Sequence, residues 1–386
     1  MRHSAQPSSA KVNTADPDRD RFIDLVRVTS MVTVVLLHWL SVMPTLSGGR
    51  VVDQNVVSVL PGLWPLTWAG DVMALFFFAG GYANWVSLNG SLRRGESYAS
   101  FLTRRVRRLL RPTFVFLGAW LAVDLLMRAV GLASMSPLGH VAIGNTIPFG
   151  PLWFLGVYLV VVVLSPWTAA AHRRWGIAVP LAMVAGVALA DSQAFLHNTG
   201  APLAANLLLV WLIPHQLGYF YADGTLKRAS TQACAVMAAA GLVMLTVLTS
   251  LPYYPRSLIN PRWIVLSMDA PMLSLVASGL WLIGVALMLR RPLERMLASP
   301  GRWRTVSRAN DVTMPVYLWH MTAYLVAISC LAWLGGSFVY STDASAQWWW
   351  GRPAVMVLSA AVLGGFLAVL RWVSQVARKT RSTVAR

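Results

Sequence analysis

The chain has 386 residues, of which 56% are hydrophobic and only 12% are charged. A soluble globular domain carries about twice that charged fraction, so the composition excludes an ordinary soluble protein. The net charge of +18 would suit a nucleic-acid-binding protein, but the Lys and Arg residues follow the boundaries of apolar segments. We therefore expect a polytopic membrane protein with no nucleic-acid partner.

Apolar stretches of about 20 residues, each long enough to cross a hydrocarbon core of roughly 30 Å, recur along the whole chain. They predict an all-α integral membrane protein, a bundle of about ten transmembrane helices. The expected spans are 23–43, 63–88, 110–132, 152–171, 176–192, 202–221, 232–251, 268–289, 312–335 and 353–374.

The positive residues predict the orientation of these spans. If the N-terminus is cytoplasmic, 27 of the 32 Lys and Arg residues fall in cytoplasmic segments. This bias predicts a multi-pass protein of the plasma (inner) membrane, in contact with its lipids, with both termini in the cytoplasm. Residues 1–22 are polar and lack a signal peptide, which predicts a disordered cytoplasmic tail. A basic cytoplasmic tail is expected at 375–386, after the membrane domain at 23–374.

The first predicted span places Arg27 and His38 in an apolar run. Eleven residues make three helical turns plus roughly 20°, so both share one face, about 16 Å apart along the axis. Asp24 lies one turn before Arg27, and we expect the two to pair. Two interpretations stay open. Either Arg27 lies at the interface and His38 is bonded between helices, or both line a path from the cytoplasm into the membrane.

The second predicted span carries Asp71, at a depth close to that expected for His38. A carboxylate within reach of His38 would set its tautomer and raise its basicity. The alternative is that Asp71 caps a broken or interfacial helix end beside Gly70. Further along this span, Gly80 and Gly81 predict the close approach of another helix backbone.

An arginine cluster precedes the third span, in TRRVRRLLRP at 103–112. Arginine binds phosphate groups bidentately, and basic clusters beside a membrane also bind anionic lipid head groups. The cluster therefore predicts either a site for a phosphorylated ligand or a lipid anchor. Its members are Arg104, Arg105, Arg107, Arg108 and Arg111.

Later spans hold isolated polar or aromatic residues. Trp153 opens the fourth span as an interfacial anchor or a pocket wall, and His215 lies near the middle of the sixth. Asp269 lies near an outer helix end, where capping is the usual role. His320, in the ninth span, is either a packing residue or a functional one. The two cysteines have no partner motif, so neither a disulfide nor a metal site is expected.

Taken in order, these residues resemble the membrane-bound acyltransferase-3 superfamily. Its hallmark is an Arg followed after ten residues by a His in the first span, with an Asp three residues before the Arg, as at Asp24, Arg27 and His38. The segment LFFFAGGY at 75–82, the RxxR motif of Arg105 and Arg108, WFL at 153–155 and YLWH at 317–320 are similar to later family motifs. Ala79 stands where the family usually has serine, so we assign it no role.

The resemblance implies an integral membrane enzyme that moves an acyl group from acyl-coenzyme A to a hydroxyl. In most members the group is acetyl, and the acceptor is a carbohydrate, a glycolipid or a natural product. His38 would act as general base, oriented by Asp71, without a metal. The resemblance also implies roles in binding: Arg27, Arg105, Arg108 and Trp153 for acyl-coenzyme A, His320 and Asp24 for the acceptor pocket.

Two other classes of protein share buried ionisable groups. A transporter or flippase for an envelope glycan or lipid intermediate would line its path with them, but it does not require an RxxR cluster beside an Arg-x10-His span. Transporters often show repeated halves, and the sequence has no evident repeat. A non-catalytic scaffold is disfavoured because His38 and both arginine motifs are intact.

Overall fold

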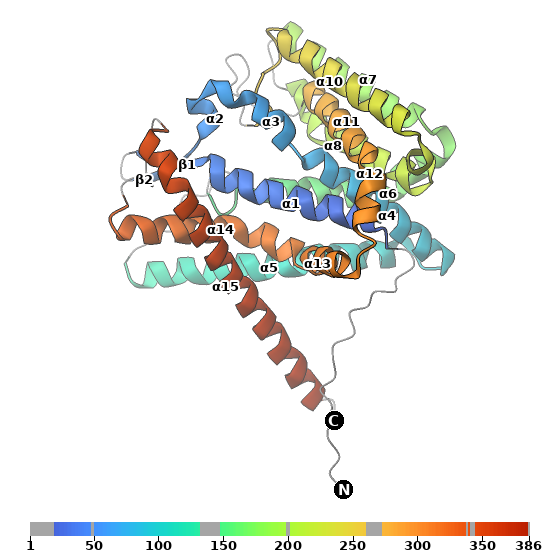
Figure 1. Ribbon diagram of the computed structural model, residues 1–386. Coiled ribbons are helices and arrows are strands. Elements are labelled where there is room, and N and C mark those ends of the chain that lie inside the picture. Colours follow the sequence, from blue (N-terminus) through green and yellow to red (C-terminus); the bar gives the residue numbers. More distant parts are fainter. Residues whose placement is uncertain are drawn as a thin grey trace.

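Helices dominate the computed structural model, which describes residues 19–47, 50–131, 147–197, 201–259, 272–336, 339 and 344–384. In Figure 1 α14 runs between α1 and α5, and α4 packs against α1. The length and apolar character of the helices confirm the prediction of an all-α multi-pass membrane protein.

Within the described residues, nine helices are long and apolar enough to cross a membrane. One of them combines α3 with α4, and α8 follows a 3₁₀ turn at Ala201–Ala205. Their bounds are Arg21–Ser41 (α1), Trp64–Gly70 (α3), Met73–Arg93 (α4), Tyr98–Ala129 (α5), Leu152–Trp175 (α6), Ala178–His197 (α7), Asn206–Ala222 (α8), Thr231–Ser250 (α10), Thr313–Trp333 (α14) and Ala346–Val384 (α15).

The eighth expected span, 268–289, is the exception. It corresponds to α11 (Leu273–Met288), which is followed by α12 (Arg290–Met296) after a bend of 50°. The count of ten is reached in the described chain only if this bent pair is one span. Asp269, interpreted from the sequence as a cap, lies outside the described residues. At the other end of the chain, α15 continues to Val384, past the expected boundary at 374.

A β-hairpin after α1 was not expected from the sequence. Strands β1 (Val42–Ser47) and β2 (Arg50–Asn55) pair antiparallel, with Val42 opposite Asn55. The short elements α2 (Val56–Val59) and η1 (Pro61–Leu63) then lead into α3. At the other end of the bundle, α9 (Thr225–Arg228) and α13 (Pro300–Asp311) connect longer helices.

Glycines bring α4 and α8 into close contact. A Cβ at Gly81 would collide with the backbone carbonyl of His215, and one at Gly218 with the carbonyl of Phe78. The predicted close approach of backbones is therefore confirmed at Gly81. At Gly80 the space is filled by a side chain instead, since a Cβ there would lie 2.7 Å from the Tyr158 ring.

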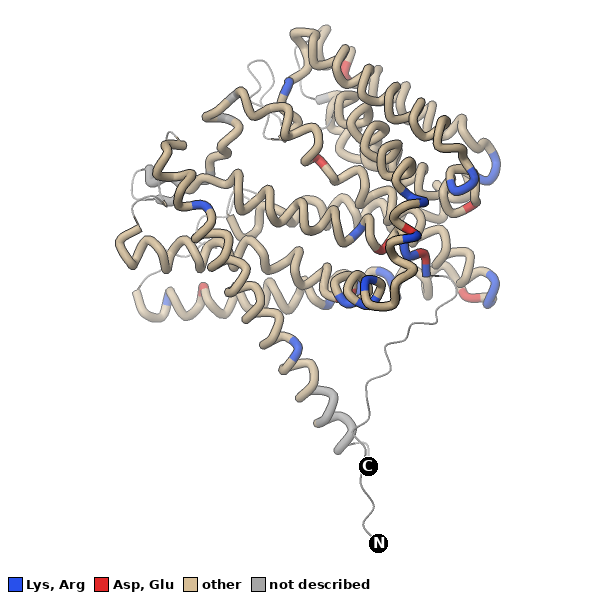
Figure 2. The backbone as a smooth tube through the Cα atoms, in the orientation of Figure 1, with Lys and Arg blue, Asp and Glu red and all other residues tan. Residues whose placement is uncertain are grey.

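The outer surface of the bundle suits a lipid environment. Phe114 and Leu126 on α5 and Val357 and Trp372 on α15 are 64–70% exposed, as expected for side chains that face hydrocarbon. Figure 2 shows Lys and Arg gathered where α1 begins and α4 ends. We call this end of the bundle the basic end.

Candidate active site

Two histidines meet inside the bundle. The Nδ1 atom of His38 on α1 lies 2.8 Å from Nε2 of His320 on α14, and the rings stack with an interplanar angle of 15°. His320 is fully buried, whereas His38 is partly exposed. The sequence singled out both residues, but it did not indicate that they touch.

The partners of His320 determine which nitrogens carry protons. Its Nδ1 lies 2.7 Å from the backbone carbonyl of Tyr317, which can only accept. In the neutral pair, His320 is therefore protonated at Nδ1, and its Nε2 accepts a hydrogen bond from the Nδ1–H of His38. It follows that Nε2 of His38 carries the free lone pair. That nitrogen has no hydrogen-bond partner among the described residues.

Side chains from three helices hold the pair in place. The Trp39 indole donates to the carbonyl of His320 at 3.0 Å. Nη1 of Arg352 on α15 donates to the carbonyl of Trp39 at 3.1 Å and contacts the Tyr324 hydroxyl at 3.3 Å. We call His38, Trp39, His320, Tyr324 and Arg352 the histidine layer.

Asp71 does not join this layer. It lies at the break between α3 and α4, where its carboxylate accepts a hydrogen bond from the Met73 N–H. Its neighbour Gly70 packs against Leu37, so the break lies beside the last turns of α1. No hydrogen bond or ion pair links Asp71 to His38 in the described chain. This position favours the helix-capping interpretation, because the broken helix leaves a backbone N–H for the carboxylate to satisfy.

A second group of polar side chains surrounds Arg105 on α5. Arg27 of α1, Tyr158 of α6 and His215 of α8 lie close enough to Arg105 for electrostatic interaction. Asn84 of α4 bonds to His215, with 3.0 Å between Nδ2 and Nε2, and both side chains are fully buried. We call Arg27, Asn84, Arg105, Tyr158 and His215 the arginine layer.

Several polar atoms of the arginine layer lack partners. Nε and Nη2 of Arg105, Nδ1 of His215 and Oδ1 of Asn84 are buried without a hydrogen bond. Arg27 is half-buried and forms no ion pair with any described residue. An unmet buried donor or acceptor costs about 1–3 kcal/mol, so these atoms favour a polar ligand between the helices. Nε and Nη2 together form a guanidinium edge that can grip an oxyanion bidentately.

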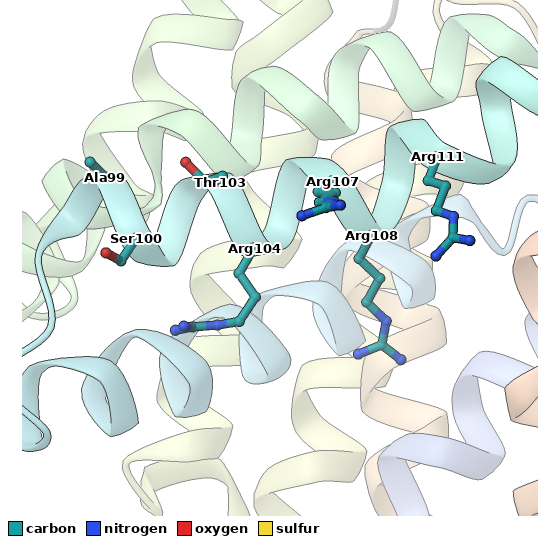
Figure 3. A pocket seen from close by; sticks show the side chains of 7 residues that line it. All are labelled: Ala99, Ser100, Thr103, Arg104, Arg107, Arg108 and Arg111. Atoms are coloured by element: carbon teal, nitrogen blue, oxygen red, sulfur yellow. The ribbon is translucent and has the colours of Figure 1, made fainter. Parts of the chain in front are cut away.

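The other arginines of α5 lie at the surface. Figure 3 shows Arg104, Arg108 and Arg111 extending from one side of the helix, where they help to line an open hollow of about 670 Å³. Arg104 is paired with Glu96. Because Arg94 and Arg104 both donate to this carboxylate, the pKa of Glu96 is lowered to about 2. Arg104 is therefore held by the protein itself, unlike Arg108.

The expected pair between Asp24 and Arg27 is not formed. Asp24 instead binds Arg19, at 2.5 Å, and accepts from the Asn310 amide at 3.0 Å. Helical side chains tilt toward the N-terminus of their helix, so Asp24 reaches back to Arg19 and away from Arg27. Asp24 thus ties the start of α1 to α13, and no described contact joins it to the histidine layer.

Trp153 lies apart from the arginines. It is 49% exposed in the first turn of α6 and packs against Phe154 and Trp211. The Tyr317 hydroxyl donates to the carbonyl of Pro151, which places this turn near His320. No ring or hydrogen-bond contact links Trp153 to Arg27, Arg105 or Arg108 in the described chain.

Sequence reasoning missed Asn84, Tyr158 and Arg352. Asn84 is an amide in an otherwise apolar span, and that was a usable signal. Arg352 directly precedes the last expected span, at 353–374, and it is only 3% exposed. Its position four residues after Trp348, over whose ring it stacks at 4.0 Å, was the available clue. The two cysteines, Cys234 and Cys330, are both free.

The fold and the two layers define a multi-pass membrane protein with a histidine pair inside a helical bundle. The family model for the acyltransferase domain of acyltransferase-3 proteins matches residues 20–370. The chain therefore belongs to the acyltransferase-3 family of membrane O-acyltransferases, which confirms the resemblance seen in its motifs. Searches of curated proteins and of solved structures found no match.

Proposed function

We propose that this acyltransferase moves an acetyl group from acetyl-coenzyme A to a hydroxyl of a carbohydrate, a glycolipid or a natural product. The observation that carries the proposal is the contact of Nδ1 of His38 with His320, whose own Nδ1 faces the Tyr317 carbonyl, because in the neutral pair this leaves a free lone pair on Nε2 of His38. A neutral imidazole held in one tautomer is suited to act as a general base near pH 7.

His38 would take the proton of the acceptor hydroxyl as its oxygen attacks the thioester carbonyl. A new C–O bond forms, the C–S bond breaks, and the coenzyme A thiolate receives the proton back from the His38 imidazolium. His320 would hold the His38 ring in its orientation, because the Nδ1–H of His320 is itself bonded to the Tyr317 carbonyl. Holding the base and both reactants in one geometry removes much of the entropic part of the barrier.

The arginine layer is the proposed donor site. The phosphates of coenzyme A would bind Arg105, Arg27 and Arg108, with the unpartnered Nε–Nη2 edge of Arg105 as the main contact. Unpartnered atoms of His215 and Asn84 offer one donor and one acceptor for an amide of the pantetheine arm. Arg27 and His38 lie on one face of α1, about 16 Å apart along the axis, which supports a donor threaded between the layers.

The basic end would face the cytoplasm, where coenzyme A is available, with both termini on that side of the plasma (inner) membrane. The concentration of Lys and Arg at this end supports the orientation. The histidine layer lies toward the opposite end of α1, which favours delivery of the acetyl group toward the outer side.

Thermal unfolding of the full chain in neutral detergent tests the donor site. A ligand that binds only the native state must raise Tm, by an amount equivalent to about 2.7 kcal/mol at a hundred times Kd. We expect acetyl-coenzyme A to raise Tm and coenzyme A lacking its 3′-phosphate to raise it less. Folded protein that shows no shift at millimolar acetyl-coenzyme A would contradict the proposal.

A further inference from the structure

Arg352 is a buried cation that the proposed reaction does not use. Its side chain is 3% exposed, and Nη1 donates to the carbonyls of Trp39 and Val42 at the end of α1. These are carbonyls left free at a helix C-terminus, where a cation is favourable. One nitrogen of the guanidinium therefore serves α1, and the remaining edge is free for another role.

The remaining edge of Arg352 and the neighbouring Trp348 indole together present three hydrogen-bond donors that have no acceptor. Nε and Nη2 of Arg352 are buried without hydrogen-bond partners, and so is Nε1 of Trp348, the residue over whose ring the guanidinium stacks. All three atoms can only donate, so a ligand that satisfies them must supply acceptors. Nε and Nη2 point in parallel from one side of the guanidinium, the geometry that matches two oxygens of a carboxylate or phosphate.

The charge of Arg352 is also unbalanced. No Asp or Glu forms an ion pair with it in the described chain, and its partners are carbonyls, the Tyr324 hydroxyl and an aromatic face. A buried charge without a counter-ion is strongly unfavourable. An anionic ligand would supply both the missing charge and the missing acceptors.

Arg352 is anchored to the two residues that neighbour the histidine pair in sequence. Arg352 binds the carbonyl of Trp39, the residue after His38, and the hydroxyl of Tyr324, one helical turn beyond His320. We propose that the acceptor is acidic: the molecule that carries the reacting hydroxyl also carries an oxyanion group, carboxylate or phosphate, which the Arg352 edge and the Trp348 N–H bind. This inference rests on the proposed function, because it places the acceptor next to Nε2 of His38.

The test compares three sugars that differ in charge: D-glucuronate, D-glucose 1-phosphate and D-glucose. Tm of the full chain in neutral detergent is measured against each sugar, with saturating coenzyme A to occupy the arginine layer. We expect at least one acidic sugar to raise Tm with an apparent Kd about tenfold or more below that of D-glucose. Whether glucuronate or glucose 1-phosphate gives the larger shift identifies the oxyanion as carboxylate or phosphate.

Variants assign the effect to the proposed residues. Arg352→Lys keeps the charge but loses the bidentate edge, and it should remove the preference for the acidic sugar. Trp348→Phe keeps an aromatic face but loses the N–H, and it should reduce the preference several-fold even if Arg352→Lys folds poorly. Arg256→Lys, at an exposed position on another segment, is the control and should leave the preference for the acidic sugar unchanged.

Equal affinity for charged and neutral sugars in the wild type, or a preference that survives both Arg352→Lys and Trp348→Phe, would overturn the inference. The coenzyme A shift measured without sugar reports separately on the proposed function. If the protein binds coenzyme A but does not prefer an acidic sugar, the proposed donor site stands and the acceptor is neutral.

Discussion

The arginine layer and the histidine layer each contain an arginine whose buried Nε–Nη2 edge has no hydrogen-bond partner. Around Arg105 the neighbours include further cations, Arg27 and Arg108, whereas Arg352 is the one cation of its layer. The first environment suits a ligand with several negative charges, and the second suits a single charge beside a neutral base. Under the proposed function, this difference separates the binding of the donor, in the arginine layer, from the chemistry, in the histidine layer.

The helices that build the layers also differ. The arginine layer uses α4, α5, α6 and α8, the histidine layer uses α14 and α15, and α1 contributes to both. Substitutions in the arginine layer should therefore change the binding of the donor, and those in the histidine layer should change the rate of transfer or the binding of the acceptor.

Removal of the base should give the largest effect. We expect His38→Ala to lower kcat for acetyl transfer by about 10²–10⁴-fold, the usual contribution of a general base. The Tm shift caused by acetyl-coenzyme A should persist, because the arginine layer is intact. His197→Ala, at an exposed position on α7, is the control. A wild-type rate in His38→Ala would exclude the general-base role.

Arg105→Ala should affect the donor instead. Loss of a charge-assisted phosphate contact is expected to raise KM for acetyl-coenzyme A about ten- to a hundredfold, with kcat largely kept at saturation. Arg104→Ala is the matched control on the same helix, because Arg104 is already paired with Glu96. Equal changes in KM for the two variants would argue against a special role of Arg105.

Gly81→Ala tests the framework that supports the arginine layer. The added methyl would collide with the carbonyl of His215, so we expect a loss of about 1–3 kcal/mol in the free energy of unfolding and a Tm several degrees lower. Gly118→Ala on α5, where nothing lies within 4 Å of the new Cβ, should leave Tm nearly unchanged. A tolerated Gly81→Ala would show that α4 and α8 are less tightly packed.

The smallest effect is expected at Glu96, at the edge of the arginine cluster. Its folded pKa of about 2 lies below the ordinary value of 4.5, so its ion pairs stabilise the protein above about pH 4.5 and lose this effect as pH falls toward 2. Glu96→Gln should lower Tm by less than about 2 °C at pH 7, since the pair is exposed to solvent. The difference from wild type should shrink as the pH is lowered, and a constant difference between pH 7 and pH 3 would contradict this.

The sequence predicted the parts of the molecule that depend on local pattern. The apolar stretches gave the spans, and the spacing of Arg27 and His38 placed both on one face of α1. The contact between His38 and His320 depends on how two helices far apart in sequence align, which no local period encodes. For the same reason the sequence predicted Asp71 as the partner of His38, whereas His320 occupies that position. The hairpin had a local signal, Gly48 and Gly49 between Val-containing runs, that a search for helices passes over.

The last helix has two halves with different surroundings. The 39 residues of α15 correspond to about 58 Å, roughly twice the thickness of the hydrocarbon core. Its first turns carry Trp348 and Arg352 into the interior, and its second half extends away from the bundle in Figure 1. We expect a reporter fused after Val384 to stand clear of both layers and to leave the activity unchanged. A chain that stops before Ala346 keeps the histidine pair but loses the arginine that fastens the end of α1.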